Sequence, residues 1–143
     1  MNTRTIQAGG SWKPLAEEVI ARLQLGTVIL LSGPLGAGKT TFVQTLAHEL
    51  GSKDIVKSPT FTLRNTYTLR QASYKRLVHI DAYRIEHPRE AMALGIEDEL
   101  ATPGTILAIE WPEHLPASAI QNAHAVRVRI EVQEDGTRVV TME

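Results

Sequence analysis

The chain contains no cysteine among its 143 residues, which excludes a disulfide framework and a thiolate metal site. Aromatic residues are scarce, at 5%, and no aromatic-basic platform for stacking RNA bases is present. The net charge is only −1, so bulk attraction to nucleic acid is not expected. The amino-terminal stretch has no apolar signal region, and no apolar run approaches membrane-spanning length. We expect a cytoplasmic protein with no membrane partner.

What remains is an ordinary globular composition, with 43% hydrophobic and 22% charged residues. A chain of this length is sufficient for one hydrophobic core but not for two. We therefore expect one domain over residues 1–143.

Hydrophobic periodicity predicts helices alternating with strands. The expected helices cover residues 14–25, 41–50 and 88–100, the last interrupted at Gly95. The expected strands cover residues 27–31, 60–69, 76–80, 105–110, 126–132 and 137–142. The turn Glu134-Asp135-Gly136 between the last two strands predicts a carboxyl-terminal β-hairpin. This order indicates an α/β layer fold with a largely parallel sheet.

The stretch from Gly33 to Thr40, GPLGAGKT, fits G-x-x-x-x-G-K-[ST] at every fixed position. Glycines allow backbone N–H groups to wrap phosphates without Cβ clashes. In such a P-loop, Lys39 approaches the β- and γ-phosphates and the Thr40 hydroxyl binds Mg²⁺. A β-branched strand before the loop and an apolar-periodic helix after it match this context. We therefore predict that this loop binds a nucleotide, with ATP and Mg²⁺ as the expected cofactors.

A P-loop also needs a carboxylate at the end of a neighbouring strand to hold Mg²⁺ through water. Asp81 and Glu110 each stand where an expected strand ends. Either residue alone would be explained as a strand-end charge. Two of them at the sheet edge where ligands bind favour a functional role.

Two further groups are candidates on weaker grounds. Tyr83 and Arg84 follow Asp81, and the arginine is placed either to reach a phosphate or to pair with a carboxylate. Ser58 and Thr60 precede the next strand, where a threonine senses the γ-phosphate in nucleotide switches. The same Ser-Pro-Thr sequence is also ordinary turn chemistry. Trp12 is expected to be a core residue.

The segments GPLGAGKTT, SPTFTL, HIDAYR, ALGIED and IEWP occur in one order and at compact spacing. This set resembles the bacterial TsaE (YjeE) family, small ATPases of tRNA threonylcarbamoyladenosine biosynthesis. The resemblance covers roughly residues 5–115. The P-loop is generic, whereas HIDAYR and IEWP together are specific to the family.

The resemblance implies a P-loop NTPase-like three-layer fold, weak ATP hydrolysis and assembly with the TsaB–TsaD pair. That pair modifies adenosine 37 of ANN-reading tRNAs, so tRNA is an indirect partner. By the same resemblance, Thr40 and Glu110 hold Mg²⁺ and Asp81 is the essential carboxylate. Trp111 lies either beside the nucleotide or in the core. The expected ATP-binding residues are Gly33, Gly36, Ala37, Gly38, Lys39, Thr40, Thr41 and Trp111.

Two departures and two alternatives accompany this interpretation. Pro34 stands where the family usually has an acidic or polar residue, and residues 70–75 and the tail after Leu115 match no family signature. A small-molecule kinase would need a second substrate pocket and a lid, for which the chain has little length. A GTPase-like interaction switch would carry NKxD and DxxG motifs, and neither occurs.

Overall fold

A computed structural model describes residues 2–54 and 64–143. The strands are β1 (Asn2–Ile6), β2 (Thr27–Ser32), β3 (Arg64–Thr68), β4 (Arg76–Asp81), β5 (Thr105–Glu110), β6 (His124–Val132) and β7 (Arg138–Met142). The helices are α1 (Lys13–Ile20), α2 (Lys39–Glu49), α3 (Pro88–Ala93), α4 (Ile96–Ala101) and the 3-10 helices η1 (Pro112–His114) and η2 (Ala117–Ala119).

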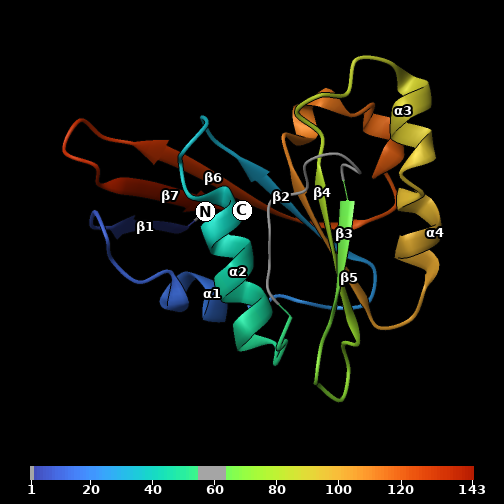
Figure 1. The fold of residues 1–143 in the computed structure, drawn as a ribbon, viewed down its shortest axis with the longest axis horizontal. Helices are drawn as coiled ribbons and strands as arrows, with labels where there is room; N and C mark the ends of the chain where they lie inside the picture. Colours follow the sequence, from blue (N-terminus) through green and yellow to red (C-terminus); the bar gives the residue numbers. More distant parts are fainter. Residues whose placement is uncertain (1, 55–63) are drawn as a thin grey trace.

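The described strands form one seven-stranded sheet in the order β1-β7-β6-β2-β5-β4-β3 (Figure 1). The four central strands β6, β2, β5 and β4 are parallel. The flanking strands β3, β7 and β1 pair antiparallel. The sheet is therefore parallel where the apolar strands lie, and the predicted carboxyl-terminal hairpin is β6 and β7.

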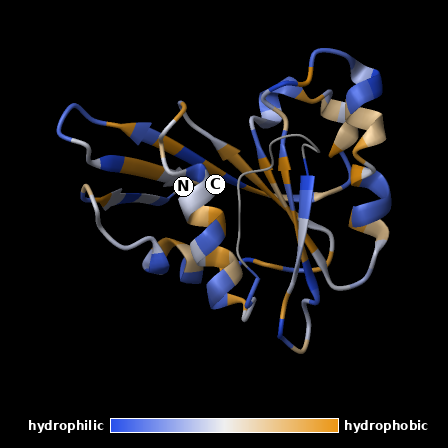
Figure 2. Cartoon of the chain, viewed as in Figure 1, coloured by the Kyte–Doolittle hydropathy of each residue, from blue (hydrophilic) through white to orange (hydrophobic). Residues whose placement is uncertain are grey.

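Helices cover both faces of the sheet, which gives three layers. One hydrophobic core includes Leu15 of α1, Phe42 of α2 and Leu31 of β2. The other includes Leu30 of β2 and Ile96 of α4. Successive residues of β2 thus enter opposite cores, which explains why this strand is uniformly apolar. Figure 2 shows the hydrophobic residues concentrated in the central strands.

The predicted elements agree with the structure most closely in the centre of the sheet. The strand 105–110 was predicted at its observed bounds, and Gly95 separates α3 from α4 with a left-handed φ of 67°. The first helix ends at Ile20, five residues before the predicted end. The strand β1 was not predicted. Within the described residues, every helix is too short or too polar to cross a membrane.

The parallel strands bring the candidate residues to one edge of the sheet. The carboxyl end of β2 leads into the P-loop, and β5 and β4 end at Glu110 and Asp81. These two carboxylates are register partners, and Glu110 is also paired with Leu31. Three strands distant in sequence therefore deliver the loop and both acids to the same place.

Candidate functional site

The loop between β2 and α2 requires glycine at several positions. Gly36 and Gly38 have φ angles of 77° and 107°, which favour glycine. A Cβ on Gly38 would lie 2.4 Å from Cζ2 of Trp12. Trp12 is buried, as predicted, but its ring also packs against the loop. The first turn of α2 begins directly after Gly38, so its free N–H groups lie at the loop.

Lys39 is buried, and its ammonium is bound to its own loop. Nζ donates to the carbonyl oxygens of Gly33 at 2.5 Å and Pro34 at 2.9 Å. It also lies 4.5 Å from the centroid of the Trp111 ring. Burial lowers the pKa of Lys39, while the Glu110 carboxylate acts in the opposite direction. Carbonyls and a π face hold this cation, and an arriving phosphate can replace them.

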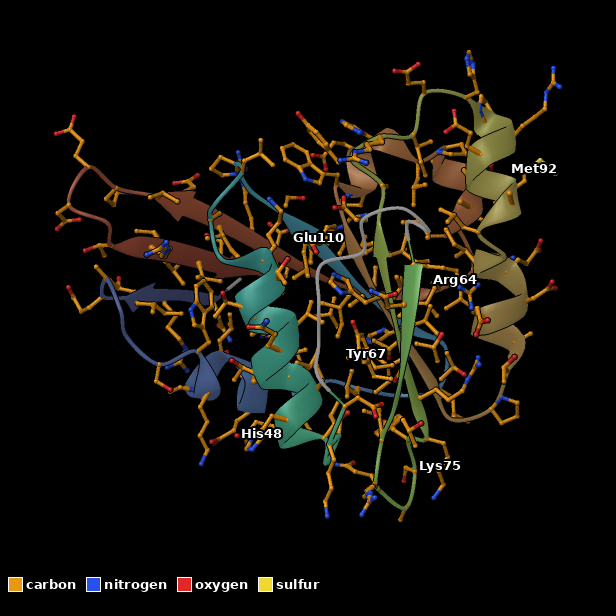
Figure 3. The ribbon with its side chains drawn as sticks, in the orientation of Figure 1. His48, Arg64, Tyr67, Lys75, Met92 and Glu110 are labelled. Carbon is orange, nitrogen blue, oxygen red and sulfur yellow. The ribbon has the colours of Figure 1, made fainter. Side chains whose placement is uncertain are left out.

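Glu110 is buried and held from two sides. Oε2 lies 2.5 Å from Nε2 of His79 and accepts a hydrogen bond from the Thr40 hydroxyl at 3.3 Å. His79 is fully buried, and its Nδ1 has no hydrogen-bond partner among residues 2–54 and 64–143. The His79 imidazole therefore holds the Glu110 carboxylate next to the Thr40 hydroxyl in the first turn of α2. Figure 3 shows Glu110 at the end of the sheet where α2 begins, with His48 toward the helix's other end.

Asp81 has a more open environment than Glu110. Its Oδ1 accepts a hydrogen bond from the Tyr83 backbone N–H at 3.0 Å. Burial raises the pKa of Asp81, and the nearby Glu110 carboxylate adds to this shift. A carboxylate with a raised pKa beside a second acid is a pattern found at functional sites.

Three aromatic rings pack together at the carboxyl ends of β4 and β5. Trp111 has φ 59°, the only positive φ of a non-glycine residue in the described ranges. Its ring centroid lies 5.0 Å from that of Tyr83 and 5.6 Å from that of His114. Nδ1 of His114 donates to the Tyr83 carbonyl at 2.8 Å. The left-handed backbone of Trp111 costs about 1–2 kcal/mol, and it places the indole against Lys39.

These groups line a cavity of about 290 Å³. Its lining residues are Leu35, Gly36, Ala37, Gly38, Lys39, Thr40, Thr41, Asp81, Tyr83, Glu110, Trp111 and Arg138. Gly33 contributes its carbonyl to Lys39 instead. Arg84 is exposed and, within the described parts of the chain, neither lines the cavity nor forms an ion pair. Ser58 and Thr60 lie outside the described residues.

Three residues at the site were not predicted. His79 belongs to the quoted HIDAYR segment, and its place two residues before Asp81, on the same strand face, could have indicated it. His114 follows IEWP closely. Arg138 lies in β7, far from any motif, and no local signal marks it.

The site fits a nucleotide with Mg²⁺. Glycine-rich backbone, a helix N-terminus and the Lys39 ammonium suit phosphates, and the Thr40 hydroxyl and Glu110 carboxylate are oxygen ligands of the kind Mg²⁺ prefers. No three His, Cys, Asp or Glu side chains gather as a metal site in the described ranges. Mg²⁺ bound with a nucleotide needs only one or two carboxylates, because phosphates and waters complete its shell.

The fold and this loop define a P-loop α/β protein. A family model described as "Threonylcarbamoyl adenosine biosynthesis protein TsaE" matches residues 7–140. The chain therefore belongs to the TsaE family of tRNA threonylcarbamoyladenosine biosynthesis proteins. The match extends through the carboxyl-terminal hairpin, beyond residue 115, where the motif resemblance ends.

Individual relatives agree with this assignment. The chain is 45% identical over 97 residues to a tRNA threonylcarbamoyladenosine biosynthesis protein TsaE of Nostoc sp., covering 66% of this chain and 57% of that protein. It is 34% identical over 125 residues to the TsaE protein of Treponema pallidum, covering 87% of each. The crystal structure of Bacillus subtilis YdiB is similar with a TM-score of 0.71 at 28% identity, covering 99% of this chain and 83% of that one.

Proposed function

We propose that this protein binds Mg-ATP at the P-loop and hydrolyses it slowly, in support of a TsaB–TsaD pair that forms threonylcarbamoyladenosine at position 37 of ANN-decoding tRNAs. The observation that carries the nucleotide part is the convergence of Lys39, Thr40, Glu110 and Asp81 on one cavity. Membership of the family supports the tRNA part.

Nucleotide binding exchanges partners within the loop. Lys39 gives up the carbonyls of Gly33 and Pro34 and binds the β- and γ-phosphates, which offer a stronger charge-assisted interaction. The N–H groups at the start of α2 donate hydrogen bonds to the phosphate oxygens. The Thr40 hydroxyl, which donates to Glu110 in this structure, would be a ligand of Mg²⁺. Mg²⁺ supplies charge neutralisation on the β- and γ-phosphates when it is bound.

The two carboxylates have separate tasks in hydrolysis. Glu110, held by His79 at the end of β5, would help to hold Mg²⁺. Asp81 is more exposed, so it orients the attacking water or its metal-bound neighbours. The two residues are register partners at the ends of β4 and β5, so the sheet holds their backbones side by side.

Calorimetry with Mg-ATP tests the phosphate site. Lys39→Ala removes the charge aimed at the phosphates and Thr40→Ala removes a direct Mg²⁺ ligand, so each should weaken binding by at least about tenfold, or 1.4 kcal/mol. Lys53→Ala is the matched control, because this lysine is exposed beyond the far end of α2. Wild-type affinity in both site variants would refute the phosphate assignment.

ATPase assays with and without the TsaB–TsaD pair test the proposed role. We expect slow hydrolysis by the chain alone and support of repeated modification cycles when the pair and tRNA are present. Fast turnover by the chain alone, together with a phosphorylated small molecule, would favour the kinase alternative instead.

A further inference from the structure

Arg138, at the start of β7, is bonded to the middle of the P-loop. Its Nε donates to the Ala37 carbonyl at 3.2 Å, and its Nη2 donates to the Gly36 carbonyl at 3.3 Å. Its Nη1 donates to Gly136 in the hairpin turn at 2.9 Å. One guanidinium therefore joins the hairpin to a loop about a hundred residues away in the sequence.

Packing holds Ala37, which is buried in the hydrophobic core, but it does not fix Leu35 and Gly36 beside it. A Cβ built on Gly36 would meet nothing within 4 Å, and the neighbouring Leu35 side chain is 70% exposed. The loop's start is different, because a Cβ on Gly33 would lie 2.8 Å from the Ile130 carbonyl of β6. The hairpin thus supports the start of the loop by contact and its middle by the hydrogen bonds of Arg138.

Peptide geometry links these carbonyls to the cavity. In a trans peptide the C=O and the following N–H point in opposite directions. When Arg138 holds the Ala37 carbonyl, the N–H of Gly38 is directed away from β7. The same geometry at Gly36 directs the N–H of Ala37 toward the Pro34 carbonyl, which accepts it at 3.1 Å. Arg138 and Pro34 therefore hold the Gly36–Ala37 peptide plane from its two sides, and Arg138 holds the carbonyl of the Ala37–Gly38 plane.

The charge of Arg138 is also available to the site. Across residues 2–54 and 64–143, no carboxylate forms an ion pair with this guanidinium. Its side chain is half-buried and lines the cavity. In the strand order, β7 lies on one side of β2, whereas β5 and β4, which carry Glu110 and Asp81, lie on the other. An uncompensated cation at this position adds to the attraction of a polyphosphate.

We propose that Arg138 is a positioning residue for phosphate binding, which holds the Gly36 and Ala37 carbonyls so that the Gly38 N–H is presented to a triphosphate. This inference rests on the proposed function, because it assigns a residue to the same nucleotide site.

The test compares Arg138→Ala and Arg138→Lys with wild type, using calorimetry with Mg-ATP and with Mg-tripolyphosphate. Arg138→Ala should raise both dissociation constants by about tenfold, since two hydrogen bonds to the loop are lost. Arg138→Lys keeps the charge but not the planar fork, so its dissociation constants should fall between those of wild type and Arg138→Ala.

Arg129→Ala is the matched control, because this arginine lies on the adjacent strand β6 and is 73% exposed. It should leave both affinities unchanged, and urea unfolding of all variants confirms that each is folded. Wild-type affinity in Arg138→Ala overturns the proposal while leaving the proposed function intact. Weakened ATP binding with unchanged tripolyphosphate binding also overturns it, in favour of a nucleoside contact. A wild-type chain that binds neither ligand overturns the proposed function and this inference together.

Discussion

Asp81 and Glu110 end neighbouring strands as register partners, yet their surroundings differ. Glu110 is buried against His79 and Thr40, whereas Asp81 has only the Tyr83 backbone N–H as a hydrogen-bond partner in the described ranges. A carboxylate held from two sides is suited to fixed coordination. A less constrained one with a raised pKa is suited to work on water.

This difference leads to a prediction for the two alanine variants. Asp81→Ala and Glu110→Ala should each abolish ATP hydrolysis, because each removes a group from the transition state. Both should retain substantial Mg-ATP affinity, since the P-loop backbone and Lys39 still hold the phosphates. Calorimetry and a phosphate-release assay on the same samples measure the two effects. Wild-type turnover in one variant would remove that residue from the site.

Gly38 is the residue with the least room in the loop. Its φ is 107°, and an added Cβ would collide with the Trp12 ring at 2.4 Å. We predict that Gly38→Ala lowers the free energy of unfolding by about 1–3 kcal/mol through overpacking and weakens Mg-ATP binding. Urea unfolding and calorimetry measure these changes.

Gly9→Ala is the control for this prediction. Gly9 also has a left-handed φ, 72°, but a Cβ there would meet no atom within 4 Å. It reports the backbone cost alone. Equal losses in the two variants would mean that the contact with Trp12 imposes no constraint of its own.

At the scale of elements, the strand β1 shows what local pattern cannot indicate. Its sequence NTRTI is mostly polar and exposed, and only Ile6 enters the core. It forms because β7, more than a hundred residues away, offers an open edge for antiparallel pairing. Glu18 of α1 then binds Asn2 at 2.7 Å and Arg4 at 3.2 Å.

The Glu18 contacts predict a pH-dependent stability. The hydrogen bond from Asn2, followed by the Arg4 interactions, lowers the pKa of Glu18 below its ordinary value. The stabilisation is therefore complete above the unfolded-state pKa and is lost as the pH falls through the lower, folded-state pKa. Glu18→Gln should cost about 0.5–1 kcal/mol at pH 7, and the difference from wild type should shrink below about pH 4.

Urea unfolding at several pH values checks this expectation, with Glu17→Gln as the control on an exposed position of the same helix. A Glu18→Gln deficit that stays constant from pH 7 to pH 3 would exclude the carboxylate as its source.

The elements that the sequence predicts well are those whose pattern is local. Residues 105–110 are all buried, and the apolar run 106–109 stands between a threonine and a glutamate, so their bounds could be predicted directly. The first helix was predicted too long because Leu23 and Leu25 continue the apolar pattern, although residues 21–26 are not helical. The hairpin was predicted from its turn residues, but its contact with the P-loop was not.

The candidate site divides in the same way. Lys39 and Thr40 follow from a continuous motif, and Asp81 and Glu110 follow from strand ends. His79 and Arg138 depend on which strands become neighbours and on which side chains then meet. Such tertiary contacts leave no periodic trace in a single sequence. The suggested roles of Ser58 and Thr60 stay predictions, since both lie outside the described residues.

The whole molecule places the P-loop cavity between two groups of strands. On one side β5 and β4 carry the carboxylates, and on the other the β6–β7 hairpin holds the loop through Arg138. The amino-terminal segment contributes through Trp12 against Gly38. A ligand in this cavity therefore contacts groups positioned by distant parts of the chain.

A weak ATPase without a phosphoryl acceptor is useful when its ATP and ADP states differ in affinity for a partner. We predict that the chain binds the TsaB–TsaD pair at least tenfold differently with an ATP analogue and with ADP, which corresponds to about 1.4 kcal/mol of differential contact. Thr60 lies close in sequence to the P-loop helix, so Thr60→Ala should bind ATP but lose this discrimination. Affinity measurements for wild type and variant in both nucleotides test the idea. Equal binding of wild type in both states would disprove the switch, and discrimination retained by the variant would reject only the role of Thr60.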